Sequence, residues 1–167
     1  MPTAILLNGH PRPCKARIRH PQRGCATLFG VPTDQDLLHE LSFYTLQLGD
    51  REFIHQHVVD AYAVQHAGPQ SKPIAIVFGL IGLYLHLERN FTGRQVQRAH
   101  MELARRRRPW EAPPIPEQRA GIGVADVLAA EPGPERHTMI DRWCKAVWLD
   151  WQHARPQIEA LARDLLQ

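Results

Sequence analysis

Apolar side chains recur at three- and four-residue steps along the C-terminal segment, residues 135–166. The stripe consists of Ile140, Trp143, Val147, Trp148, Trp151, Ile158, Leu161 and Leu165. This spacing matches the turn of an α-helix, and no segment alternates at period two for long enough to indicate a strand. We therefore predict an all-α protein. Pro156 lies within the stripe and marks a place where the last helix bends or divides.

Start and stop signals predict further helices ahead of this one. Thr33, which is followed by two acidic residues, begins a helix that extends to about Leu48. Asp50 begins the next helix, which ends at a Gly-Pro pair. A third helix begins near Pro73 and contains two glycines, Gly79 and Gly82, which allow a neighbouring helix to approach closely. A capping box of Thr92 and Gln95 begins a fourth, to about Arg107. The prediction is a helical bundle of four to six helices.

Prolines and charges divide the chain into four parts of a single domain. Eleven of the fourteen prolines lie in residues 2–32 and 109–134. We expect an irregular arm over 1–32, a helical core over 33–107, a proline-rich connector over 108–134 and a C-terminal helix over 135–167. The arm is basic and the first half of the core is acidic, which suits an arm packed on the core and equally an arm that binds an acidic partner.

Composition excludes several classes of protein. The net charge of +3 is too small for a polybasic nucleic-acid tail, and three scattered cysteines do not form a disulfide framework. The N-terminus lacks the features of a signal peptide, so we expect a cytoplasmic protein. The most apolar stretch, Ile74–Leu87, has fourteen residues and is too short to cross a bilayer, so we expect no membrane partner. No nucleotide-binding or serine-hydrolase motif is present.

Histidine and cysteine are the unusual residues, with ten and three copies. The N-terminal arm carries His10, Cys14, His20 and Cys25 in a segment with little apolar material to fold around. A zinc ion would hold such a segment in shape, because zinc accepts mixed cysteine and histidine ligands. The spacing differs from that of a common zinc knuckle, so an arm that simply packs its cysteines stays an alternative.

The second predicted helix carries another cluster. His55, Val59, Tyr62 and His66 fall on one helical face, whereas His57 and Asp60 lie on a different face, three residues apart. That separation lets an imidazole and a carboxylate share a cation or a hydrogen bond. Alternatively, Asp60 orients a histidine or pairs with an arginine of the arm.

Other polar residues have simpler interpretations. Arg105 to Arg108 complement a helix C-terminus, and no aromatic platform accompanies them, which argues against nucleic acid as a partner. Glu88 is expected to form an ion pair with Arg89 or to cap a helix end. The tryptophans are more typical of a core than of a ligand pocket, although their helix is also a possible homodimer face. Five histidines look incidental, without partners at a useful spacing: His39, His86, His100, His137 and His153. Cys144 lies within the C-terminal helix, where we expect it to serve in packing.

The string VDAYAVQH, from Val59 to His66, resembles a signature of an uncharacterised bacterial family of unknown function, DUF5946. The resemblance extends to His20-Pro21, to Gly24-Cys25, to L-x-L-E-R at residues 85–89 and to three C-terminal tryptophans. It implies that the family's cysteine falls on Cys25, its helix histidine on His55, its aspartate on Asp60 and its Q-H pair on Gln65 and His66. The family's opening knuckle is reduced here to His10 and Cys14, and a histidine typical of its third helix is Gly79, which indicates a diverged member.

Three functional hypotheses follow. The leading one is a divalent metal, zinc, bound between the arm and the second helix by Cys14, His20, Cys25 and His55, with Asp60, Tyr62 and His66 beside it or at the rim of a substrate pocket. A catalytic zinc would keep a position open for water, with Asp60 or a neutral histidine as general base. The second is a non-enzymatic module that docks a protein or nucleic acid through the arm and Arg105 to Arg108. The third is a metal-free acid–base enzyme that uses His55, Tyr62 and His66. The sequence identifies neither a small-molecule substrate nor a reaction.

Overall fold

The computed structural model describes residues 31–106, 109–119 and 121–163, and these residues are helical without any strand. The all-α prediction is therefore confirmed. The described residues from Pro32 onward belong to one compact unit. Within the described ranges, none of the helices combines the length and the apolar character that spanning a bilayer requires.

The first half of this unit contains four helices. They are α1 (Asp34–Gln47), α2 (His55–Gln65), α3 (Pro73–Arg89) and α4 (Gly93–Arg105). The predicted capping box of Thr92 is present, and Thr33 forms a second one: the Thr33 hydroxyl accepts from the backbone N–H of Asp36, and that of Thr92 accepts from the backbone N–H of Gln95. In return, the two side chains at the third position accept from the backbone N–H of Thr33 and Thr92. These reciprocal bonds satisfy backbone donors that a helix N-terminus otherwise leaves unpaired.

The second half contains α5 (Val124–Ala129), α6 (Pro134–Asp150), a short 3-10 turn (Gln152–Ala154) and α7 (Arg155–Arg163). The described residues thus form seven α-helices, one more than the four to six expected. The connector holds α5, and the predicted C-terminal helix divides. The division falls at Trp151–Ala154, ahead of Pro156, because Pro156 lies in the first turn of α7, where a helix does not need its missing N–H.

The start of α2 also differs from the prediction. The helix begins at His55 and not at Asp50. The Asp50 carboxylate instead accepts from the backbone N–H groups of Glu52 and Ile54, and Phe53 adopts a left-handed conformation with φ of 61°. A helix cannot continue through a left-handed residue, so Asp50 closes a turn ahead of α2.

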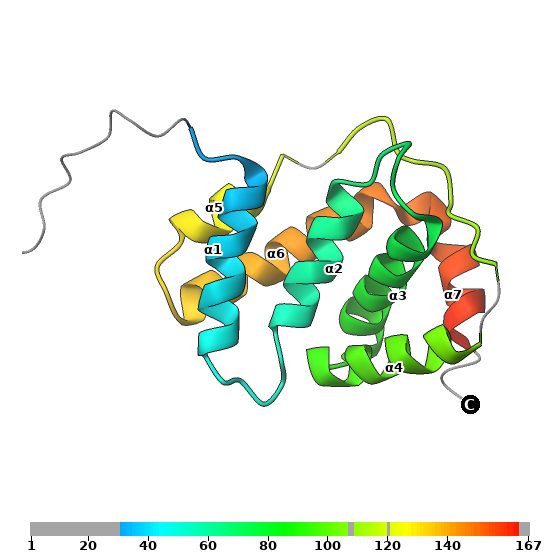
Figure 1. Ribbon diagram of the computed structural model, residues 1–167, viewed down its shortest axis with the longest axis horizontal. Coiled ribbons are helices and arrows are strands. Elements are labelled where there is room, and N and C mark those ends of the chain that lie inside the picture. The colour runs from blue at the N-terminus through cyan, green and yellow to red at the C-terminus, as the bar shows by residue number, and fades with distance from the viewer. Residues whose placement is uncertain (1–30, 107–108, 120, 164–167) are drawn as a thin grey trace, which may run out of the picture. The chain divides into compact units, whose positions relative to one another are not determined.

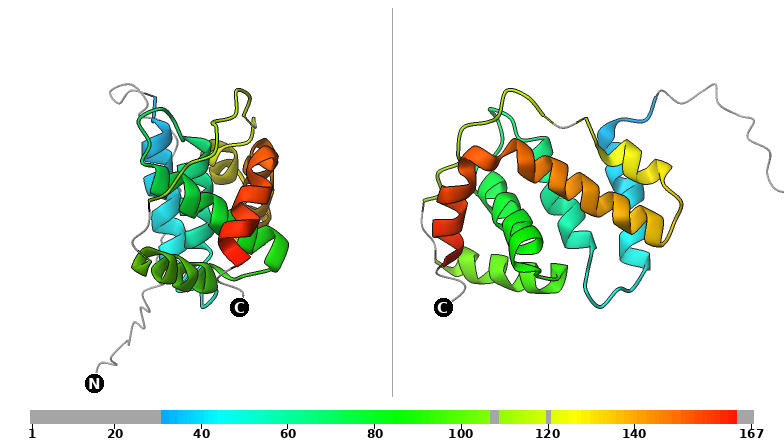
Figure 2. Two further views of the ribbon diagram at one scale, coloured as in Figure 1. Left: turned by 90° about the vertical axis from the view of Figure 1, so that its right-hand side faces the viewer. Right: turned by 180° about the vertical axis from the view of Figure 1, so that it is seen from behind.

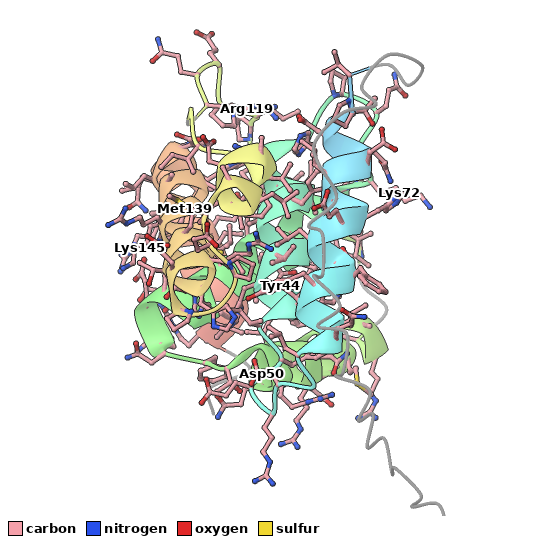
Figure 3. All side chains as sticks on the ribbon, turned by 90° about the vertical axis from the view of Figure 1, so that its left-hand side faces the viewer. Tyr44, Asp50, Lys72, Arg119, Met139 and Lys145 are labelled. Carbon is pink, nitrogen blue, oxygen red and sulfur yellow. The ribbon has the colours of Figure 1, made fainter. Side chains whose placement is uncertain are left out.

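Helix α3 is the centre of the fold, and α2 lies along one side of it (Figure 1). Helix α6 crosses both on the face away from the viewer, which the reverse view shows in front (Figure 2). Helices α1 and α5 lie together beyond α2, while α4 and α7 lie against α3. Tyr44 joins α1 to the start of α6: its hydroxyl accepts from the backbone N–H of Gly133, and the Arg136 guanidinium lies over its ring, 4.6 Å from the centroid (Figure 3).

The tryptophans of the C-terminal stripe are buried, as their spacing predicts. Trp143, Trp148 and Trp151 are each at most 5% exposed. The Trp143 indole N–H donates to Gln65 Oε1 and that of Trp148 to Glu88 Oε1. These bonds satisfy the polar end of each indole inside the core, where an unpaired N–H is costly.

Candidate functional site

Helix α2 carries the residues that the sequence singled out, and it presents them on two faces. The outer face holds His55, Val59, Tyr62 and His66, and Val59 is 41% exposed there. The inner face holds His57 and Asp60, both buried toward α3 and α6. The predicted separation of these two sets therefore exists in the structure.

His55 begins α2 and faces α1. Its Nδ1 lies 2.9 Å from the hydroxyl oxygen of Thr45, and its ring meets that of Phe53 edge to face at 5.7 Å. Burial lowers the pKa of His55, which favours the neutral imidazole. The other three residues of the predicted metal set, Cys14, His20 and Cys25, lie outside the described residues, as does His10.

Tyr62 and His66 lie together at the far end of α2. Their rings stack with centroids 4.0 Å apart, and His66 Nε2 lies 3.1 Å from Asp34 Oδ2. Burial and the nearby Asp34 raise the pKa of Tyr62, so its phenol stays protonated. Eleven residues of helix separate His66 from His55, a rise of about 16 Å. The structure thus brings Tyr62 and His66 together but leaves His55 apart from them.

Asp60 lies on the inner face, away from the Tyr62–His66 pair. It is 3% exposed, and its Oδ1 accepts from the Gln56 side chain at 3.0 Å. Its Oδ2 is buried without a hydrogen-bond partner and lies against Gly82 of α3, where an added Cβ would be 2.0 Å away. Burial raises the pKa of Asp60 well above its usual value, which keeps the carboxyl protonated. Among the described residues its partner is Gln56, and neither a histidine nor an arginine bonds to it.

His57 stacks on His86 of α3, with ring centroids 3.7 Å apart and an interplanar angle of 20°. His86 Nε2 in turn donates to Asp141 Oδ1 of α6 at 3.2 Å. Burial and the neighbouring His86 lower the pKa of His57 to about 3, so His57 is a neutral base at physiological pH. The sulfur of Cys144, fully buried, lies 3.7 Å from the His57 carbonyl oxygen.

A cavity of about 490 Å³ opens beside this stack. It lies between the turn before α2, the C-terminal end of α3 with the loop that follows it, and α6. Its walls carry Asp50, Glu52, Ile54, His57, His86, Asn90, Phe91, Thr92, His137 and Asp141. This cavity combines a neutral buried imidazole with carboxylates that reach solvent, which is the arrangement of a ligand or acid–base site.

The interpretation of His86 as incidental was wrong. His86 is the polar residue near the end of the most apolar stretch in the chain, and that isolation is the signal that would have drawn attention to it. Its partners come from α2 and α6, far away in sequence, so no spacing pattern reveals them. His137, also set aside, lies one helical turn from Asp141 on α6 and lines the same cavity.

The remaining histidines of the described residues have structural partners. His100 Nε2 donates to the carbonyl oxygen of Phe78 at 2.9 Å, and burial lowers the pKa of His100 to about 4. His153 Nε2 donates to the carbonyl oxygen of Pro114 at 2.8 Å, and His39 contacts the side chain of Gln35. In the ranges that the structure describes, no three His, Cys, Asp or Glu side chains converge closely enough to hold a metal ion.

Glu88 has a different ion-pair partner from the one predicted. Glu88 accepts from Arg155 of α7 and from Trp148, whereas Arg89 donates to the hydroxyl of Tyr84. In the arginine run, Arg105 pairs with Glu102 at 3.0 Å on the same helix. Glu88 and Arg105 thus have ion-pair partners within the helical fold, while Arg107 and Arg108 lie outside the described residues.

Comparison with known proteins identifies a family. A protein-family model described as a family of unknown function, DUF5946, matches residues 10–152. No curated protein and no solved structure shows significant similarity to the chain. The match extends from the N-terminal arm through α2, with its VDAYAVQH signature, to the last tryptophan of the stripe. Since it covers more than half of the sequence, the chain belongs to the DUF5946 family of unknown function.

Proposed function

We propose that the protein binds one zinc ion through Cys14, His20 and Cys25 of the N-terminal arm and Nε2 of His55. The observation that carries this proposal is the bond between His55 and Thr45. The proposal treats α2 as the rigid part of the site, to which the arm adds the remaining ligands.

Thr45 selects the tautomer of His55. The Thr45 hydroxyl lies 3.0 Å from the Leu41 carbonyl oxygen and 3.1 Å from that of Ser42, so its single proton is donated within α1. The hydroxyl oxygen then accepts from His55 Nδ1–H at 2.9 Å. This leaves the lone pair on Nε2, for which no described residue supplies a hydrogen bond. Metal-binding histidines are commonly oriented in this way, by a hydrogen bond from the ring nitrogen that does not bind the metal.

The other expected ligands suit zinc. Two thiolates and two imidazoles make a tetrahedral set that zinc accepts readily, and binding energy of this kind can hold a segment that has little apolar material of its own. A site with four protein ligands would be structural. A site that lacks one of them would keep a position for water and would be catalytic.

Metal analysis of the full chain, purified without a histidine tag, tests the proposal. We expect about one equivalent of zinc per chain, and less than about a tenth in Cys25→Ser and His55→Gln. His39→Gln is the matched control, because His39 is an exposed histidine of the neighbouring helix and should leave the zinc content unchanged. Wild-type protein that takes up no zinc from a zinc-containing buffer would overturn the proposal.

Cobalt substitution adds a readout of the ligands themselves. With cobalt in place of zinc, the wild-type chain should show thiolate charge-transfer absorption and tetrahedral ligand-field bands, both of which should be lost in Cys25→Ser and in His55→Gln and kept in His39→Gln. A spectrum that is identical in wild type and His55→Gln would remove His55 from the site.

A further inference from the structure

The charged side chains that line the cavity beside His57 and His86 are acidic. Three carboxylates, Asp50, Glu52 and Asp141, line it from two different elements, and no lysine or arginine is among its described lining residues. Hydrogen bonds offset the cost of burial and hold the pKa of Asp50 below its usual value, and the bond from His86 does the same for Asp141. Both groups are therefore anionic at neutral pH, and the cavity attracts cations.

His57 supplies an unsatisfied group at the same place. Its side chain is enclosed, with 5% of the residue exposed, and Nδ1 is buried without a partner. An unpaired buried polar atom costs about 1–3 kcal/mol. No described residue bonds to Nε2 either, and the residue lines the cavity, so the ring offers an unpartnered nitrogen to a ligand there.

The dimensions of the site favour a cation larger than a metal ion. The described His, Cys, Asp and Glu side chains do not converge in threes at coordination distances. Asp141 Oδ1 is already bonded to His86, and both Asp50 oxygens accept from backbone N–H groups, so these carboxylates offer their remaining lone pairs at hydrogen-bond distance. Ile54 and Phe91 add apolar walls.

We infer that this cavity is a binding site for a small organic cation, a primary alkylammonium compound whose charged end lies between Asp141 and Glu52, near His57. The ammonium group donates to the carboxylates, and its hydrocarbon part lies against Ile54 and Phe91. The volume of about 490 Å³ falls within the range of small-molecule sites. This site is on the inner side of α2 and does not depend on the zinc proposal.

Calorimetric titration of the full chain with 1,4-diaminobutane tests the inference. We expect saturable binding of one diamine, weakened by added salt, and no binding of 1,4-butanediol, the uncharged compound of the same shape. Asp141→Asn and Glu52→Gln should each weaken binding by about tenfold or more. Glu135→Gln is the matched control, since it removes an equal charge from α6 at a residue that lines a different hollow.

Glu52→Gln should leave the fold intact, because the Glu52 side chain is exposed and forms no hydrogen bond or ion pair with the described residues. Weaker binding by this variant therefore cannot be ascribed to misfolding. Ring resonances of His57 and His86 should shift on titration, which places the diamine in this cavity. If Glu135→Gln and Glu52→Gln weaken diamine binding equally, the cause is the general negative charge of the surface, and the inference is overturned. An absence of diamine binding would also overturn it, as would binding of a divalent metal ion alone with the same pattern among the variants.

Discussion

Asp60 is a carboxyl group whose two oxygens have unequal surroundings, one bonded to Gln56 and one unpaired against Gly82. Such a group is least costly when it is protonated. In this form the Asp60 carboxyl carries no charge, so it adds no anion to the buried face of α2. A catalytic role for Asp60 would need an opening of α2 from α3.

Asp60→Asn should change how stability depends on pH. The pKa of Asp60 is raised in the folded state, so the folded chain retains a proton that the unfolded chain releases. The contribution of Asp60 to the free energy of unfolding therefore falls as pH rises above about 4, by at most about 1.4 kcal/mol per pH unit, and the asparagine variant lacks this contribution.

Urea unfolding at several pH values measures this effect as the difference between wild type and Asp60→Asn. His57 and His100 act in the opposite sense below about pH 6.5, because burial lowers the pKa of both, but they are common to the two proteins and cancel. The exposed Glu117→Gln is the control for a lost carboxylate. A difference that stays constant with pH would contradict the protonated form of Asp60.

At the scale of elements, the approach of α2 to α3 depends on two glycines. A Cβ at Gly79 would meet a side-chain carbon of Val64 at 2.6 Å, and one at Gly82 would meet Asp60 Oδ2 at 2.0 Å. The two glycines in the sequence predicted close packing of helices, and in the structure Val64 and Asp60 of α2 lie opposite them. Helix contact, and not a cleft, is what they serve.

Gly82→Ala should destabilise the protein by about 1–3 kcal/mol through overpacking, even though alanine is the better helix former by about 1 kcal/mol. Gly68→Ala, at a position with no atom within 4 Å of the added carbon, is the control and should be close to neutral. Adding Asp60→Ala removes the obstacle, so the double variant should lose less than the sum of the two single losses. Additive losses in urea unfolding would contradict the clash.

Local signals predicted the elements well where the determinants lie close together in the sequence. Thr33, Pro73 and the Thr92 capping box specify the starts of α1, α3 and α4, and the Gly-Pro pair specifies the end of α2, each within a few residues. The start of α2 was missed because Asp50 caps a turn as readily as a helix. The His57–His86–Asp141 cluster was missed because three helices bring it together, and helical spacing describes one helix at a time.

For the whole molecule, Glu88 is the ionic link between three helices. From α3 it accepts from the Trp148 indole of α6 at 3.0 Å and from the Arg155 guanidinium of α7 at 2.6 Å. The sequence predicted Arg89 as the partner of Glu88, because the two residues are adjacent in the chain. It could not predict Arg155, which is 67 positions away.

Glu88→Gln should lower the free energy of unfolding by about 1–3 kcal/mol, since it weakens charge-assisted bonds and the partly buried contact with Trp148. Glu159→Gln is the matched control: Glu159 also faces Arg155, at 3.6 Å within α7, but a partly exposed pair of this i,i+4 kind contributes at most about 0.5 kcal/mol. Chemical denaturation followed by tryptophan fluorescence measures both. Equal losses in the two variants would show that Glu88 is no more than a surface pair.

Cys144 lies at the centre of the same core, fully enclosed and close to the His57 backbone. Because burial raises the pKa of its thiol, the sulfur is shielded both from solvent and from ionisation. The other two cysteines of the chain, Cys14 and Cys25, belong to the proposed zinc set. A thiol-specific reagent therefore reacts with Cys144 only in molecules whose helices have separated. The rate at which Cys144 is labelled thus reports how often the bundle opens.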